Sequence, residues 1–181
     1  ARGDIPANNL KEFAVWAKKN GKPVIIASYA PTAVPALIAA KIAKRDGWPY
    51  KVVSFPNPTI KELIAGDADL STAGAEGALS YAKAGQTKIL SAWGPERNPN
   101  YPNAATPKEE GYGELFTWGG MAAPVGVPKD IINKLSSVMM EALKDKPVQD
   151  QLKKSGIPAL PMSADQMSKR VVDDSKWISE L

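Results

Sequence analysis

Short runs of β-forming residues alternate with helical patterns through the first two-thirds of the chain, and this alternation constrains the fold more than any other feature. A helix between consecutive strands is typical of right-handed βαβ units, so the spacing predicts a mostly parallel α/β sheet. The first helix is expected between a cap at Asn8 or Asn9 and a stop at Gly21. The predicted strands are Val24–Ser28, Tyr50–Phe55, Asp69–Ala73 and Lys88–Trp93, with helices over about 32–44, 59–66 and 75–84 between them.

The alternation ends after the fourth predicted strand. Residues 94–117 are dense in Pro, Asn and Gly and predict a long surface connection, with one helical turn at Pro107 to Glu110. The apolar segment Trp118–Ala123 is expected to form one more strand. Three helices follow, the first from Pro128, the second ending at Gly156 and the third opening with a capping box at Ser163 and Gln166.

These three helices carry broad apolar stripes and need a layer to cover. One strand of about five residues is not a sheet. Either the helices pack against the first sheet, or their own sheet comes from residues outside this sequence, and we favour the second.

Composition removes several classes of function. The chain has no Cys and no His, which excludes disulfides, thiolate metal sites, Ser/His and Cys/His triads and the usual zinc sites. It also lacks phosphate-loop and dinucleotide fingerprints, so neither a metal nor a cofactor is expected. The net charge of +4 suits an anionic partner, but its 23 basic and 19 acidic residues are interleaved, without the basic and aromatic runs of a nucleic-acid surface. No apolar run approaches the ~20 residues of a membrane span, and the first residues are not a signal peptide.

Polar strand-to-helix turns follow the first three predicted strands. In a parallel sheet these turns meet at the carboxyl edge, where ligands bind in open α/β folds. The free N–H groups at a helix start favour an anion there. The alternative for the first turn is an ordinary βα connection with Thr32 as the helix N-cap. The candidate ligand-binding residues are Ser28, Tyr29 and Thr32 in the first turn, Asn57 and Thr59 in the second, and Ser71 and Thr72 in the third.

The charged residues near these segments have plainer interpretations. Asp67 and Asp69 precede a strand and are interpreted as turn residues rather than metal ligands. Glu109 and Glu110 are expected to cap or solvate the helical turn, and Arg97 is interpreted as a solvated charge in the Pro-rich connection. No catalytic residue is proposed.

Four segments together resemble a known family. They are "LIAGDADL" (63–70), "AKAGQTKILSAWGPER" (82–97), "YPNAATPKEEGY" (101–112) and "WGGMAAPVGVPKDIINKL" (118–135). Their order is similar to that in the extracytoplasmic solute receptors of the tripartite tricarboxylate transporters, the Bug or TctC-type proteins. The resemblance covers the chain from about Ile5 to its end.

The resemblance implies a periplasmic-binding-protein-like, Venus-flytrap α/β protein. It would capture a small organic carboxylate in an interlobe cleft by hinge closure and deliver it to the membrane permease subunits of a tripartite transporter. Residues 5–117 would form lobe two, and residues 118–181 the C-terminal portion of lobe one, whose N-terminal part would lie outside this sequence. The protein would be exported to the periplasm with its leader removed. It would be neither an enzyme nor inserted in the membrane.

By position, the family's glycine- and serine-rich carboxylate loop falls on Ala27–Val34, which adds Ala33 to the candidate residues. Here the chain departs from the family, because Ala27, Ala30, Pro31 and Ala33 stand where several glycines are usual. Such a loop is stiffer and narrower than a glycine loop. Tyr29 in this turn favours an aromatic or bulkier acid.

Two other classes of function remain open at this point. One is an effector-sensing or interaction module of a larger protein. The other is a hydrolase or isomerase that uses Ser, Asp or Glu without His, and it would need a carboxylate or Lys beside a nucleophile at the sheet edge.

Overall fold

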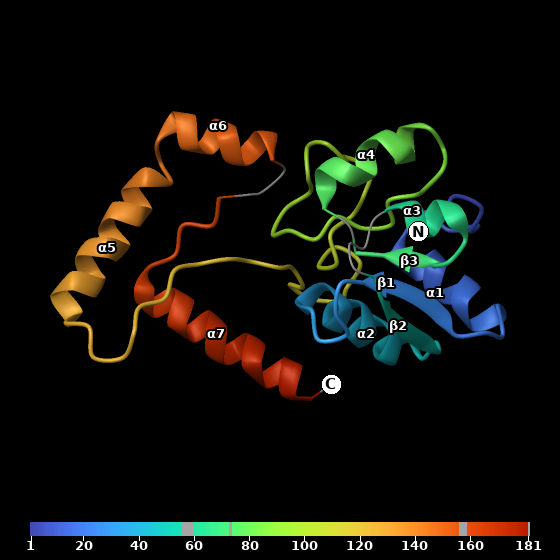
Figure 1. Cartoon of the computed structure of the whole chain (residues 1–181), viewed down its shortest axis with the longest axis horizontal. Coiled ribbons are helices and arrows are strands. Elements are labelled where there is room, and N and C mark those ends of the chain that lie inside the picture. The colour runs from blue at the N-terminus through green and yellow to red at the C-terminus, as the bar shows by residue number, and fades with distance from the viewer. Residues whose placement is uncertain (56–59, 73, 156–158, 181) are drawn as a thin grey trace. The chain divides into compact units, whose positions relative to one another are not determined.

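The computed structural model describes residues 1–55, 60–72, 74–155 and 159–180, and it divides into two compact units, Ala1–Thr117 and Trp118–Leu181. Each unit is described by itself (Figure 1). Among the described residues, no helix is both long enough and apolar enough to span a membrane.

The first unit is built on a parallel sheet, as predicted. Its strands are β1 (Val24–Ser28), β2 (Tyr50–Ser54) and β3 (Leu70–Ser71), in the order β2-β1-β3 (Figure 1). The central strand β1 is the most apolar, and its side chains alternate between the two faces of the sheet. Val24, Ile26 and Ser28 are fully buried on one face, and Ala27 packs with Leu63 and Ala68 on the other.

The first unit also contains four helices, and each lies where a helical pattern predicts it. They are α1 (Leu10–Lys19), α2 (Val34–Asp46), α3 (Ile60–Ala65) and α4 (Ala75–Lys83). Asn9 is the N-cap of α1, and its side chain accepts the N–H of Glu12 at 2.8 Å. Helix α2 ends at Gly47, whose φ of 69° is left-handed and suits glycine.

Two predicted strands are absent from the described residues, and both predictions were wrong for the same reason. The run Lys88–Trp93 has no strand structure; its start is tied to residues 1–3 through a single antiparallel bridge between Arg2 and Thr87. The segment Trp118–Ala123 is irregular as well. A β-prone run becomes a strand only when a neighbouring strand takes its backbone hydrogen bonds, which composition alone does not supply.

Helix α1 receives a second cap from a distant part of the chain. Glu110 Oε1 accepts the N–H of Leu10 at 3.0 Å, although 100 residues separate them. Its other carboxylate oxygen is buried and has no hydrogen-bond partner among the described residues. Burial raises the pKa of Glu110, and hydrogen bonds from the backbone of Leu10 and Lys11 only partly oppose that shift. The carboxylate therefore joins the 101–112 loop to α1 at an electrostatic cost.

This cost predicts a measurable pH dependence. Because the folded pKa of Glu110 is raised, the folded state holds the proton more tightly than the unfolded state. Its contribution to the free energy of unfolding therefore falls as pH rises through 4.5, the ordinary value, and on through the raised one. Urea unfolding between pH 4 and 7 should show Glu110→Gln gaining stability relative to the parent protein as pH increases. Glu96→Gln, at an exposed position, is the control. A stability difference for Glu110→Gln that stays constant with pH would contradict this account.

The second unit consists of helices α5 (Lys129–Ala142), α6 (Lys146–Lys154) and α7 (Ala164–Ser179). The predicted capping box is present: Ser163 accepts the N–H of Gln166 at 3.3 Å, and the Gln166 side chain accepts the N–H of Ser163 at 2.9 Å. None of these three helices has a buried residue. The apolar side chains left exposed on α5 and α7 are Ile131, Leu135, Val138, Met139, Val171 and Val172.

One carboxylate anchors the start of this unit to α7. Asp174 accepts hydrogen bonds from the indole Nε1 of Trp118 at 2.6 Å and of Trp177 at 3.0 Å, and from Arg170 Nε at 2.9 Å. Burial acts to raise the pKa of Asp174, but these three donors outweigh it and hold the pKa below its usual value. The Trp118 side chain, rather than strand pairing, thus holds the start of the irregular segment after Thr117 against α7.

Candidate functional site

The turn after β1 shapes the first part of the carboxyl edge of the sheet. Ser28 is fully buried, and its hydroxyl donates to the carbonyl oxygen of Ala30 at 3.1 Å. The N–H of Ala33 donates to the same carbonyl, also at 3.1 Å. The hydroxyl proton of Ser28 is therefore used within the turn. Ser28 stabilises the conformation of the turn and has no hydroxyl proton left to donate to a ligand.

The start of α2 has no side-chain cap. Its N-cap is Ala33, in extended backbone conformation, so the interpretation of Thr32 as the cap was wrong. Pro35 lies in the first turn and has no N–H, which leaves the N–H groups of Val34 and Ala36 to point out of the helix start. Thr32 and Tyr29 are exposed beside it. An N-terminus of this kind carries partial positive charge and suits an anion.

The end of β3 provides a second, similar position. Ser71 Oγ is buried and has no hydrogen-bond partner in the described part of the chain. Thr72 follows it, half-buried. Helix α4 then begins after Gly74, again with no side-chain cap. An unpartnered buried hydroxyl costs free energy unless something outside these residues bonds to it, so this position is suited to a hydrogen-bonding ligand.

The strand register decides which candidate residues are brought together. Ser28 pairs with Ser54 on β2, whereas Ser71 on β3 pairs with Ala27. Paired residues of parallel strands share a face, and successive residues alternate. Ser28 and Ser71 therefore lie at neighbouring strand ends but on opposite faces of the sheet. Asn57 and Thr59 lie outside the described residues.

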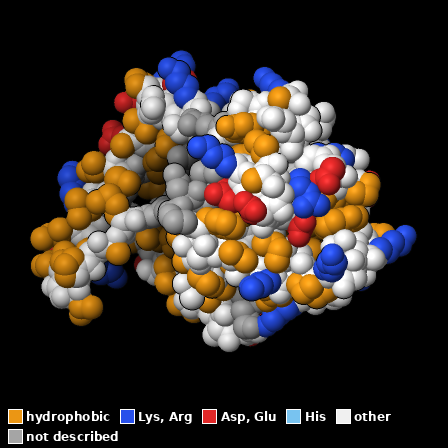
Figure 2. All heavy atoms as spheres, turned by 45° about the vertical axis from the view of Figure 1, so that its right-hand side comes forward, with side chains coloured by type: hydrophobic (Ala, Val, Ile, Leu, Met, Phe, Trp, Pro, Cys, Tyr) orange, Lys and Arg blue, Asp and Glu red, His pale blue; other side chains and the backbone are white. Residues whose placement is uncertain are grey.

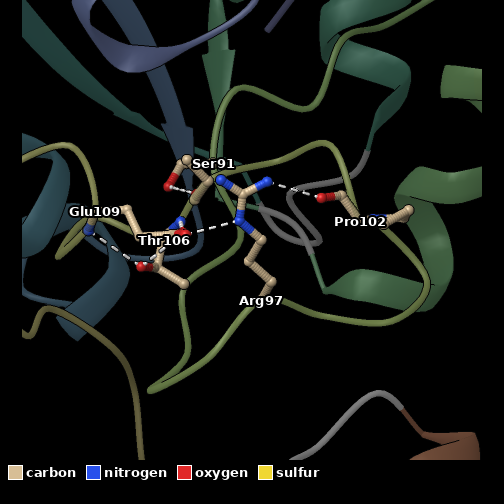
Figure 3. Close-up of polar contacts among 6 residues, drawn as sticks. Ser91, Arg97, Pro102, Thr106 and Glu109 are labelled. Carbon is tan, nitrogen blue, oxygen red and sulfur yellow. Dashed lines mark hydrogen bonds and ion pairs between the residues drawn. The ribbon is translucent and has the colours of Figure 1, made fainter.

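The long connection is held by a cap at Glu109, which the sequence predicted, and by contacts of Arg97, which it did not predict. Arg97 is exposed to solvent, as expected, but it is also paired: its Nε bonds Glu109 Oε1 at 2.8 Å, and its guanidinium donates to the carbonyl of Pro102 at 2.9 Å (Figure 3). Glu109 Oε2 accepts the N–H of Thr106 at 2.7 Å, and the Thr106 hydroxyl accepts the N–H of Glu109 at 3.3 Å. This is a capping box on the turn predicted at Pro107 to Glu110.

These contacts pair the positive charge of Arg97 with the carboxylate of Glu109. The hydrogen bond from the backbone of Thr106, followed by that from Arg97, lowers the pKa of Glu109. The carboxylate is therefore ionised near neutral pH and partners Arg97. The spacing of Thr106 and Glu109, three residues apart, is the capping-box signal in the sequence. Arg97 is the further residue that bonds to Glu109.

An open hollow of about 490 Å³ lies at the opposite edge of the sheet, where the strands begin. Its one acidic side chain, Asp69, accepts the N–H of Ile25 at 2.9 Å and lies 3.1 Å from a guanidinium nitrogen of Arg2. Arg2 also pairs with Asp4 at 2.6 Å. Asp69 thus fixes the start of the strand, as its interpretation as a turn residue implies. The charges of Asp69 and Arg2 are already paired with each other, and Arg2 also pairs with Asp4. The residues that line the hollow are Arg2, Asn20, Lys22, Pro23, Ile25, Lys51 and Asp69.

On the face in Figure 2, basic side chains are separated by hydrophobic and acidic ones. Within the described ranges there is no group of three or more acidic, His or Cys side chains that could hold a metal ion. We therefore place the candidate site at the carboxyl edge, around the starts of α2 and α4.

Comparison with known proteins gives one consistent family. The family described as "Tripartite tricarboxylate transporter family receptor" matches residues 1–181. A curated relative from Cupriavidus necator, "UPF0065 protein in gbd 5'region", is 23% identical over 175 residues, covering 96% of this chain and 54% of its own length. A UPF0065 protein from Agrobacterium vitis is 27% identical over 190 residues, covering 99% and 55%. The chain thus spans about half the length of these curated relatives.

Solved structures show the same fold. The periplasmic binding protein BugD superposes with a TM-score of 0.73 at 26% identity, over 99% of this chain and 62% of BugD. A TctC solute-binding protein from Polaromonas gives 0.81 at 21% identity, over 99% and 63%. MatC from Rhodopseudomonas palustris, solved with bound malate, gives 0.70 at 23% identity, over 99% and 64%. The expectation of a periplasmic-binding-protein-like α/β fold is confirmed.

Proposed function

The chain belongs to the tripartite tricarboxylate transporter receptor family, and from this premise we propose that it binds a small organic carboxylate at the carboxyl edge of the β2-β1-β3 sheet. The family is one of receptors, which favours capture of a solute over its chemical conversion. The malate in MatC is an example of such a ligand in a protein of the same fold.

One observation carries the proposal. A helix of 13 residues starts at this edge with Ala33 as its N-cap, and the Ala33 side chain makes no capping hydrogen bond to the first turn. A carboxylate oxygen is the acceptor that such N–H groups bind best, with about 0.3–1 kcal/mol per interaction at exposed positions and more where water is excluded. On the neighbouring strand, Ser71 Oγ has no hydrogen-bond partner among the described residues and offers a hydroxyl donor at the same edge, on the opposite face of the sheet from Ser28.

The wider role extends the same proposal. The protein would act as an extracytoplasmic receptor in the periplasm and pass its ligand to the membrane permease subunits of a tripartite transporter. This is supported by the family match and by the similarity to the periplasmic binding protein BugD.

The lobe assignment is also a proposal. Residues 5–117 would be one ligand-binding lobe, and residues 118–181 would belong to the other. Support comes from the division of the structure at Thr117 and from the apolar side chains that α5 and α7 leave exposed. Helices with such stripes normally cover a further layer of structure, and here we propose a β-sheet from polypeptide outside residues 1–181.

Isothermal titration of the full-length protein with mono-, di- and tricarboxylates and aromatic acids tests the function. At least one acid should bind with a measurable heat that disappears with the matching amide, because the amide lacks the anionic acceptor. If no acid in the panel binds, the proposal fails.

A further inference from the structure

Two exposed apolar side chains border the proposed carboxylate position. Tyr29, the first residue after β1, is 61% exposed, and Val34, the first residue of α2, is 38% exposed. Neither contributes fully to the core, unlike Ala33 between them, which is buried. An apolar lip of this kind, next to a few convergent polar donors, is the usual composition of a small-molecule site.

The polar groups at this edge are suited to a ligand with a single negative charge. Residues 28–34 and 71–75 include no Lys, Arg, Asp or Glu. Arg97, in the long connection, is bonded to Glu109 and to the Pro102 carbonyl. Recognition there rests on neutral hydroxyls and N–H groups, which suit one carboxylate. A second carboxylate above Tyr29 and Val34 would lose its water without gaining a cation.

We propose that Tyr29 and Val34 select an acid with one carboxylate and a flat apolar body, an aromatic monocarboxylate, over aliphatic di- and tricarboxylates. This inference rests on the proposed function and specifies its ligand class. The carboxylate binds at the start of α2, and the ring of the ligand packs on the phenol of Tyr29. Offset and edge-to-face ring packing supports roughly a three- to tenfold gain in affinity.

Titration of the full-length protein with benzoate, phenylacetate, succinate and malate tests the class. Benzoate or phenylacetate should bind at least about tenfold more tightly than succinate or malate, because both packing and desolvation favour the aromatic acids. Tighter binding of malate or succinate would overturn the inference while leaving the proposed function intact. If none of the four acids nor any other carboxylate binds, the proposed function itself fails.

Substitutions at Tyr29 test the contact. Tyr29→Ala should weaken aromatic-acid binding roughly three- to tenfold, whereas Tyr29→Phe should retain it, because the ring rather than the hydroxyl makes the contact. Val15→Ala removes a similarly exposed apolar side chain from α1 and should leave affinity unchanged. Thermal unfolding checks that all three variants fold. Equal affinity for the aromatic acid in Tyr29→Ala and the parent protein would overturn the role of Tyr29.

Discussion

Ala33→Asp is expected to abolish carboxylate binding while leaving the protein folded. Ala33 is the N-cap of α2 and already has the extended backbone of a capping residue. An aspartate there would accept the N–H groups of the first helical turn itself, and N-cap aspartates stabilise helices by about 1 kcal/mol relative to alanine. Its charge would also repel a ligand carboxylate about 4 Å away, by up to about 4 kcal/mol at an effective dielectric constant of 20. Affinity should fall at least about a hundredfold.

Three comparisons make this result specific. Ala33→Asn caps the helix without a charge, so it should weaken binding less than aspartate does. Pro128→Asp places the same carboxylate at the N-cap of α5, which also has no side-chain cap, and should leave affinity unchanged. Urea unfolding of each variant separates lost binding from lost folding. Normal affinity in a folded Ala33→Asp protein would remove the start of α2 from the site.

Leu135→Asp is expected to lower the free energy of unfolding of the full-length protein by about 2–4 kcal/mol. Leu135 is 49% exposed on α5 within residues 1–181, on the stripe shared with Ile131 and Val138. If a sheet covers that stripe, the substitution removes a buried leucine, which contributes about 1.5–3 kcal/mol, and buries a charge without a partner.

The matched control is Asn133→Asp, which adds the same carboxylate to an exposed position of α5 away from the apolar stripe. It should change stability by less than about 0.5 kcal/mol, as surface substitutions usually do. Equal effects of Leu135→Asp and Asn133→Asp in chemical unfolding would show that the stripe faces solvent, and the lobe proposal would then lose its support.

Local sequence signals predicted the fold where the interactions themselves are local. The strand Val24–Ser28, the N-cap at Asn9 and the capping box at Ser163 each depend on residues within a few positions, and each is confirmed. Predictions that needed a distant partner did less well. Lys88–Trp93 has the composition of a strand but pairs with no strand in the described part of the chain, and Glu110 caps a helix 100 residues earlier.

The candidate site likewise separates into features that depend on local sequence and features that do not. The sequence predicted that the polar turns meet at the carboxyl edge, because they follow successive strands. It did not show that the Ser28 hydroxyl is bonded inside its turn, or that Ser71 faces the other side of the sheet, because both depend on backbone geometry and register. Nor did it show that Ala33 rather than Thr32 caps α2, because the helix begins two residues later than its pattern suggested.

Amide NMR of the full-length protein during titration with the acid that binds tests the central claim most directly. Hydrogen bonds from backbone N–H groups to a carboxylate move the corresponding amide resonances. The account predicts that the largest shifts occur at Val34 and Ala36 and at the start of α4, and that they saturate with the affinity measured by calorimetry. Saturable shifts confined to the opposite edge of the sheet, around Lys22 and Lys51, would contradict it.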